Sequence, residues 1–182
     1  MNKKVSILGW ATLLGFGLAG LSLVYFFQQT SLVALFVGHW SIPNQLFAGL
    51  LSGITGAFIS LKIINAPFFR KEKEKYNALI NSWPWTIKGI IFISICAGIG
   101  EELLFRAGIQ PFLGLWVTAF LFVFIHGYLN PWNWRISVYG TVMILFIALM
   151  GYLFERAGIL SAMVAHAVFD AVLLYWIAVR KS

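Results

Sequence analysis

Three charged side chains interrupt an otherwise apolar stretch of the sequence, which reads GIGEELLFRAG at residues 98–108. Two of them, Glu101 and Glu102, belong to the six acidic residues of the whole chain. If this stretch crosses a membrane, each charge near the bilayer centre costs about 2.5–3.5 kcal/mol on insertion scales. Charges kept there at such a cost should face the protein interior or a water-filled cavity, so they predict a functional site.

Helical spacing distinguishes the two glutamates. Glu102 and Arg106 are four residues apart, so they share one helix face and can form an ion pair with the acid on the favourable N-terminal side. We interpret this pair as structural. Glu101 is turned about 100° away from Glu102 and has no such local partner. It is therefore the free carboxylate, which could take a proton from water as a general base.

A histidine in a later apolar stretch can approach Glu101. The stretch FVFIH occupies residues 122–126, and His126 lies as far beyond Leu113–Gly114 as Glu101 lies before it. A turn at Leu113–Gly114 would form an antiparallel helical hairpin. We expect this hairpin to bring both side chains to a similar depth.

The last apolar stretch contains HAVFD at residues 166–170. His166 and Asp170 share one helix face, where the carboxylate can bond the imidazole and fix its tautomer. A single intramembrane histidine is more often a hydrogen-bonding group between helices, and His39, beside Trp40, is assigned no role. Here, however, three of six acidic residues, one arginine and two of three histidines occupy apolar stretches. This combination favours a functional polar site.

The elements that must position these groups are membrane helices. Of the 182 residues, 60% are hydrophobic and 10% are charged, which leaves too little polar surface for a soluble domain. Apolar runs of about 18 or more residues recur, as is typical of membrane-spanning helices. The formal net charge of +7 has no soluble basic domain to act through, so we expect no nucleic-acid partner. The predicted fold class is an all-α, polytopic membrane helical bundle.

Hydropathy predicts about six transmembrane helices in one membrane domain: residues 5–27, 46–66, 86–108, 113–130, 136–154 and 158–179. Residues 31–40 are too short to cross alone, so we expect them to lie at the interface or to re-enter the membrane. Residues 67–85 form the one substantial polar loop. All lysines and arginines except Arg106 and Arg156 fall on one side of this arrangement, which predicts that both termini are cytoplasmic.

In this order, the three polar motifs resemble those of the CAAX-protease and bacteriocin-processing family of intramembrane proteases. That family carries Glu-Glu-x-x-x-Arg, then Phe-x-x-x-His, then His-x-x-x-Asn or Asp on successive membrane helices. Here the motifs read EELLFR at 101–106, FVFIH at 122–126 and HAVFD at 166–170. The resemblance covers about residues 86–175. It implies an endopeptidase in the plasma membrane of a bacterium that cleaves membrane-associated peptides or proteins.

The resemblance also implies roles for the motif residues. Glu101 would act as general base on a water molecule that His126 helps to position. His166 and Asp170 would serve the oxyanion or the scissile carbonyl. Glu102 would hold the first helix of the site in register through its ion pair.

Two histidines and a carboxylate could instead ligate zinc. His126 and His166 lie on different expected helices, without the His pair of an H-E-x-x-H motif, so we expect no cofactor. An alternative function is a non-catalytic membrane immunity or scaffold protein, in which the same polar network joins helices. The lipid bilayer is the expected partner in either case, and the sequence leaves the oligomeric state open.

Overall fold

The computed structural model of the protein describes residues 2–28 and 31–179, and within these ranges it contains helices and no strand. The expected all-α fold is confirmed for this part of the chain. In chain order the elements are α1 (Lys3–Ala11), η1 (Thr12–Phe16), α2 (Gly17–Leu23), η2 (Val24–Gln28), α3 (Leu32–Val37), α4 (Ile42–Ile64), η3 (Pro67–Phe69), α5 (Arg70–Asn81), α6 (Ile87–Glu102), η4 (Leu103–Ile109), α7 (Gln110–Ile125), α8 (Trp134–Arg156) and α9 (Ile159–Ala178). The segments η1, η2 and η4 are π-helical, and η3 is a 3₁₀ turn.

Within the described ranges, five helical stretches are long and apolar enough to cross a membrane: Lys3–Gln28, Ile42–Ile64, Ile87–Ile125, Trp134–Arg156 and Ile159–Ala178. The expected count of about six is therefore not confirmed. The difference arises because the two spans expected at 86–108 and 113–130 are joined into the single 39-residue stretch Ile87–Ile125.

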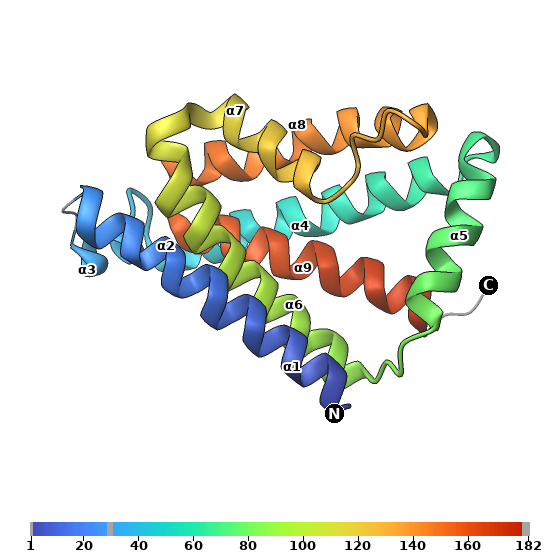
Figure 1. Ribbon diagram of the computed structural model, residues 1–182. Coiled ribbons are helices and arrows are strands. Elements are labelled where there is room, and N and C mark those ends of the chain that lie inside the picture. Colours follow the sequence, from blue (N-terminus) through green and yellow to red (C-terminus); the bar gives the residue numbers. More distant parts are fainter. Residues whose placement is uncertain (1, 29–30, 180–182) are drawn as a thin grey trace.

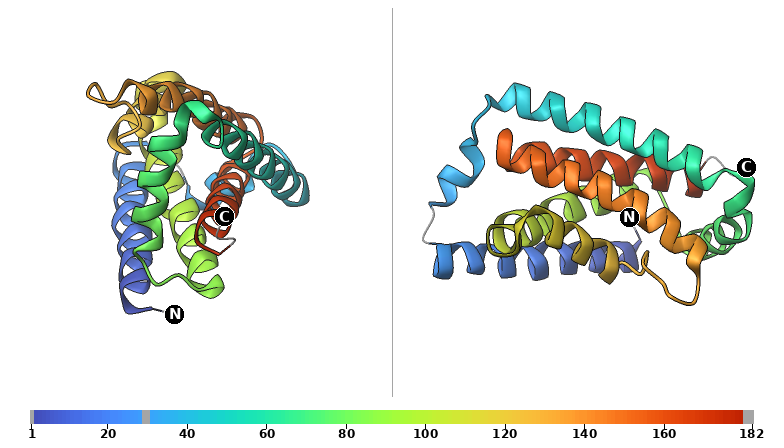
Figure 2. Two further views of the ribbon diagram at one scale, coloured as in Figure 1. Left: turned by 90° about the vertical axis from the view of Figure 1, so that its right-hand side faces the viewer. Right: turned by 90° about the horizontal axis from the view of Figure 1, so that it is seen from above.

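This long stretch is broken at Gly114, whose φ of 74° and ψ of 167° are non-helical. A positive φ is readily adopted by glycine, which lacks a Cβ. No atom lies within 4 Å of where a Cβ would be, so the requirement for glycine is conformational and not steric. Beyond this point α7 turns back toward the end of the bundle at which α6 begins (Figures 1 and 2). The turn expected at Leu113–Gly114 is thus present.

Helix α9 packs against α4, α6 and α8 and forms the centre of the bundle (Figure 1). Gly49 and Gly53 of α4 and Gly98 of α6 face it, and a Cβ at any of them would lie 2.6 Å from an α9 carbonyl oxygen. Small residues of this kind let membrane helices approach closely. The close contact at Gly98 places the helix with the two glutamates directly against the helix with His166.

The N-terminal end of α1, the C-terminal end of α9, helix α5 and the α7–α8 connection lie at one end of the bundle (Figures 1 and 2). The short helix α3 lies at the opposite end. Residues 67–85, expected as a polar loop, contain the helix α5, Arg70–Asn81. Its sequence RKEKEKYNALIN is rich in strong helix formers, which explains why a polar segment is helical.

Candidate active site

Glu102 is the centre of a buried network of charged side chains. It is fully buried, its Oε2 accepts a hydrogen bond from Arg106 Nε at 2.8 Å, and its Oε1 lies 2.8 Å from His166 Nδ1. The contact with Arg106 confirms the ion pair that the four-residue spacing predicts. The contact with His166 joins α6 to α9 between residues 64 positions apart, and helical spacing within one helix does not predict it.

Arg106 lies in the π-helical segment η4, which directly follows the two glutamates. Single π-helical turns are frequent at functional sites. In a membrane, backbone carbonyls freed by irregular helix geometry need partners inside the protein. Gln28 Nε2 supplies this partner to the carbonyl oxygens of Ala107 and Gly108, at 2.7 and 3.3 Å. The N-terminal helical stretch Lys3–Gln28 therefore supports the segment that carries Arg106.

Glu101 and His126 face each other, with 3.4 Å between Glu101 Oε2 and His126 Nε2. His126 Nδ1 lies 2.6 Å from the carbonyl oxygen of Phe122, which can only accept, so this nitrogen carries a hydrogen. In a neutral ring Nε2 is then an acceptor, and it faces a carboxylate that also accepts. Glu101 Oε2 is buried and has no hydrogen-bond partner among the described residues. The pair is therefore suited to a water molecule that donates a hydrogen bond to each.

Both ring nitrogens of His166 face carboxylates. Nδ1 lies 2.8 Å from Glu102, and Nε2 lies 3.5 Å from Asp170 Oδ2. A neutral imidazole has one N–H and can donate to only one of these groups, whereas an imidazolium can donate to both. The contact expected between His166 and Asp170 is present, although 3.5 Å is too long for a strong hydrogen bond. Asp170 thus leaves Nε2 free to donate elsewhere.

A cavity of about 560 Å³ lies beside these side chains. It is lined by four polar side chains that the sequence motifs single out: Glu101, His126, His166 and Asp170. Most other lining residues are apolar, and Trp83 and Trp85 of the α5–α6 connection are among them. The His126 side chain is 33% exposed and that of Glu101 is 11% exposed, so the base candidate is the more deeply placed of the two.

Phe122 packs against both histidines of the site. Its ring is stacked on His126 with centroids 4.2 Å apart, and it meets His166 edge to face at 5.8 Å. The Arg106 guanidinium carbon lies 5.8 Å from the centre of the same ring. Phe122, the first phenylalanine of FVFIH, therefore packs against side chains of all three motifs.

Two polar side chains outside the three motifs also reach this region. Tyr128, in the connection after α7, lines the cavity, and desolvation raises the pKa of its phenol, so it remains a hydrogen-bond donor. Gln110 accepts a hydrogen bond from Arg106 Nη1 at 3.2 Å. A signal for Gln110 exists in the sequence, since it is a polar residue four positions beyond Arg106 in an apolar stretch. Tyr128 has no such signal, because tyrosine is common at membrane interfaces.

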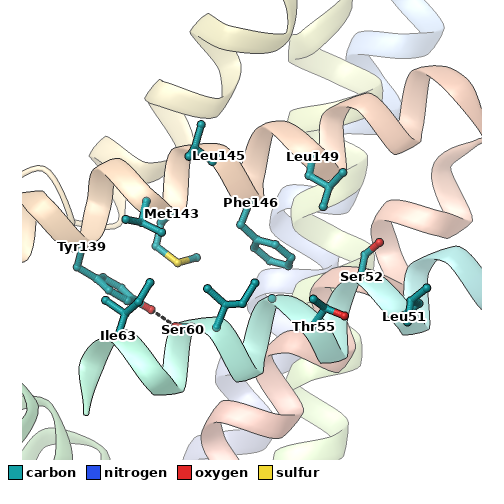
Figure 3. A pocket seen from close by; sticks show the side chains of 13 residues that line it. Leu51, Ser52, Thr55, Ser60, Ile63, Tyr139, Met143, Leu145, Phe146 and Leu149 are labelled. Carbon is teal, nitrogen blue, oxygen red and sulfur yellow. Dashed lines mark hydrogen bonds between the residues drawn. The ribbon is translucent and has the colours of Figure 1, made fainter. Parts of the chain in front are cut away.

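A second cavity, of about 390 Å³, lies between α4 and α8 (Figure 3). Its walls are largely apolar, and a hydrogen bond between Ser60 and Tyr139 lies at one end (Figure 3). Met143 and Phe146 line both cavities. These two side chains therefore separate the polar site from a groove between two membrane-spanning helices.

In residues 2–28 and 31–179, no group of three or more His, Cys, Asp or Glu side chains is arranged to hold a metal ion. One nitrogen of each histidine is already engaged, His126 Nδ1 by the Phe122 carbonyl and His166 Nδ1 by Glu102. The other nitrogens face different carboxylates, those of Glu101 and Asp170. The donor atoms thus form two separate pairs instead of one ligand set.

Comparison with known proteins confirms the resemblance found in the motifs. Residues 83–172 match the family of type II CAAX prenyl endopeptidases described as Rce1-like. The uncharacterized protein YpbD of Bacillus subtilis (strain 168) is 37% identical over 89 residues, which cover 48% of this chain and 44% of that protein. The chain thus matches less than half of the length of this curated relative. No solved structure matches the chain.

Proposed function

We propose that this chain, whose residues 83–172 are Rce1-like, is an intramembrane endopeptidase that hydrolyses peptide bonds of membrane-associated peptides or proteins. The observation that carries the proposal is the pairing of Glu101 with His126 at 3.4 Å on the wall of a 560 Å³ cavity. A carboxylate and an imidazole nitrogen that both accept hydrogen bonds can hold and activate one water molecule. The lipid bilayer surrounds the site, and the orientation with cytoplasmic termini is part of the proposal.

In the proposed reaction, the Glu101 carboxylate takes a proton from this water while His126 Nε2 accepts its second hydrogen bond. The water oxygen bonds to the scissile carbonyl carbon, and the carbonyl π electrons move onto its oxygen. Donors placed around a developing oxyanion commonly make the largest single contribution to such a step. The tetrahedral intermediate then collapses, the C–N bond breaks, and Glu101 returns its proton to the leaving amine.

His166 is the proposed donor to the oxyanion. It lines the cavity, and as an imidazolium it carries an N–H at Nε2, which lies 3.5 Å from Asp170 Oδ2 and can donate to a substrate oxygen. Glu102 Oε1 accepts a hydrogen bond from His166 Nδ1 at 2.8 Å, which keeps the ring oriented. Glu102 is therefore proposed to act through His166, and Arg106 to keep Glu102 in place.

The proposed reaction uses activated water and no metal or organic cofactor. The two separate donor pairs support this choice, because neither pair alone supplies the three protein ligands of a typical catalytic zinc site. The oxyanion donors and the base all come from the chain itself.

The test compares the chain with its Glu101→Gln variant, which keeps the shape of the side chain but removes the base. Membrane peptides are compared by mass spectrometry between cells that contain each form, and candidate substrates are then cleaved by purified protein in liposomes. We expect cleavage to fall by about 10²–10⁴-fold, the usual contribution of a general base.

The matched control is Glu74→Gln, which changes an exposed glutamate on α5 and should cleave like the unmodified chain. Equal cleavage by Glu101→Gln and the unmodified chain would contradict the proposal. That result would favour the non-catalytic immunity or scaffold function instead.

A further inference from the structure

A chain of hydrogen bonds leads from Arg106 away from the cavity to the last turn of α8. Arg106 Nη1 donates to Gln110 Oε1 at 3.2 Å. Gln110 Nε2 donates to Glu155 Oε1 at 2.8 Å and to the Gly151 carbonyl oxygen at 3.1 Å. Gln110 is 2% exposed, so its amide group is shielded from bulk water.

The partners of Gln110 determine how its amide group is oriented. Its Nε2 lies between two oxygen acceptors, and its Oε1 faces a guanidinium, which can only donate. A flipped amide would place its NH₂ against Arg106 and its oxygen against two other oxygens. Gln110 therefore links Glu155 to Arg106 in one orientation only.

The backbone of α8 leaves space for this link at Gly151. A Cβ at this position would lie 2.6 Å from Gln110 Oε1 and 3.3 Å from Arg106 Nη1. Any larger residue would displace the amide from between α8 and η4. The glycine and the buried glutamine thus fit each other across two helices.

Together these contacts form a series that we name the relay: Glu155, Gln110, Arg106, Glu102 and His166. Each contact in the relay measures between 2.8 and 3.2 Å. Glu155 is exposed, and it lies in the last turn of α8. That end of α8 lies opposite the end of the bundle that carries α5 (Figures 1 and 2). The relay therefore connects an exposed carboxylate at one end of the bundle with the ring of His166.

We propose that Gln110 and Glu155 are positioning residues, which hold Arg106 so that Glu102 keeps His166 in place. Neither residue lines the cavity, so both act only through the relay. The effect on catalysis rests on the proposed function. The effect on His166 does not, because it follows from the contacts alone.

The first experiment measures the ¹⁵N NMR signals of the His166 ring without any substrate. The chain has three histidines, so ¹⁵N-histidine labelling yields few ring signals, which His→Gln variants can assign. In Gln110→Leu, Arg106 loses its second acceptor and Glu102 shifts, so we expect the His166 ring signals to move. Those of His39 should stay in place.

The control is Ser60→Ala, which removes a buried hydrogen bond between α4 and α8. Its partner Tyr139 lies near the beginning of α8, whereas Glu155 lies in the last turn of that helix. This variant should lower thermal stability and leave the His166 signals unchanged. It separates a general loss of packing from the specific effect of the relay.

The second pair of variants changes Glu155, which is exposed, and surface substitutions usually change stability by less than about 0.5 kcal/mol. Glu155→Gln keeps an oxygen that can accept from Gln110 and should preserve the His166 signals. Glu155→Leu removes it and should move them in the same direction as Gln110→Leu. Unchanged His166 signals in both Glu155→Leu and Gln110→Leu would overturn the proposal.

Kinetics then test the effect on the reaction. Loss of an outer hydrogen-bonding partner costs about 10–100-fold at metal sites, and we expect kcat to fall about tenfold in Glu155→Leu with KM unchanged. Glu155→Gln should restore kcat. If the unmodified chain cleaves nothing, the proposed function fails while the ring signals still decide whether the relay exists. If the signals move but kcat does not, the positioning role is refuted and the proposed function stands.

Discussion

Glu102→Gln should lower the free energy of unfolding far more than Glu101→Gln, although both remove one negative charge from adjacent positions of α6. Glu102 is fully buried, and each of its oxygens accepts from a different donor at 2.8 Å. A glutamine supplies one acceptor and one donor group, so its NH₂ would meet either Arg106 or His166. Removing one partner of a buried ion pair typically costs about 3–5 kcal/mol, because the remaining charge is uncompensated.

Glu101 differs because its Oε2 has no hydrogen-bond partner among the described residues and lies 3.4 Å from His126. A glutamine there loses little, so we expect a change within about 1 kcal/mol. For a chain of 182 residues, 1 kcal/mol corresponds to about 2–4 °C in Tm. The expected loss is therefore roughly 6–20 °C for Glu102→Gln and less than about 4 °C for Glu101→Gln.

The assay is thermal unfolding of both variants in the same detergent, followed by the fluorescence of the eight tryptophans. Folding of each variant at low temperature is checked by circular dichroism before the comparison. Equal losses in the two variants, or a neutral Glu102→Gln, would refute the idea that Glu102 is the structural centre and Glu101 the free carboxylate.

Two further predictions concern packing and the cofactor. Gly98→Ala places a Cβ 2.6 Å from the Met163 carbonyl oxygen and should cost about 1–3 kcal/mol in detergent unfolding, whereas Gly15→Ala, with no neighbour within 4 Å, should be neutral. Equal effects of the two would contradict the close α6–α9 contact. Treatment of purified protein with 1,10-phenanthroline should leave cleavage of an identified substrate unchanged; inactivation that added zinc reverses would show a metal-dependent reaction.

Several features of the protein follow from the sequence alone. The scarcity of charge excludes a soluble fold, and apolar runs of about 18 or more residues indicate membrane helices, which satisfy their backbone hydrogen bonds within one segment. The ion pair of Glu102 and Arg106 follows from their four-residue spacing, and a turn assumed at Leu113–Gly114 brings Glu101 and His126 to a similar depth. These are local properties, set by residues within one helix or one hairpin.

Other features required the tertiary structure. The contact of Glu102 with His166 depends on how closely α6 approaches α9 at Gly98, and hydropathy carries no information on which helix faces meet. The hydrogen bonds from Gln28 to carbonyl oxygens of the π-helical segment η4 join residues about 80 positions apart in the chain. The sequence thus determined which polar groups enter the membrane, whereas the packing of the helices decided which of them touch, because those contacts join residues far apart in the chain.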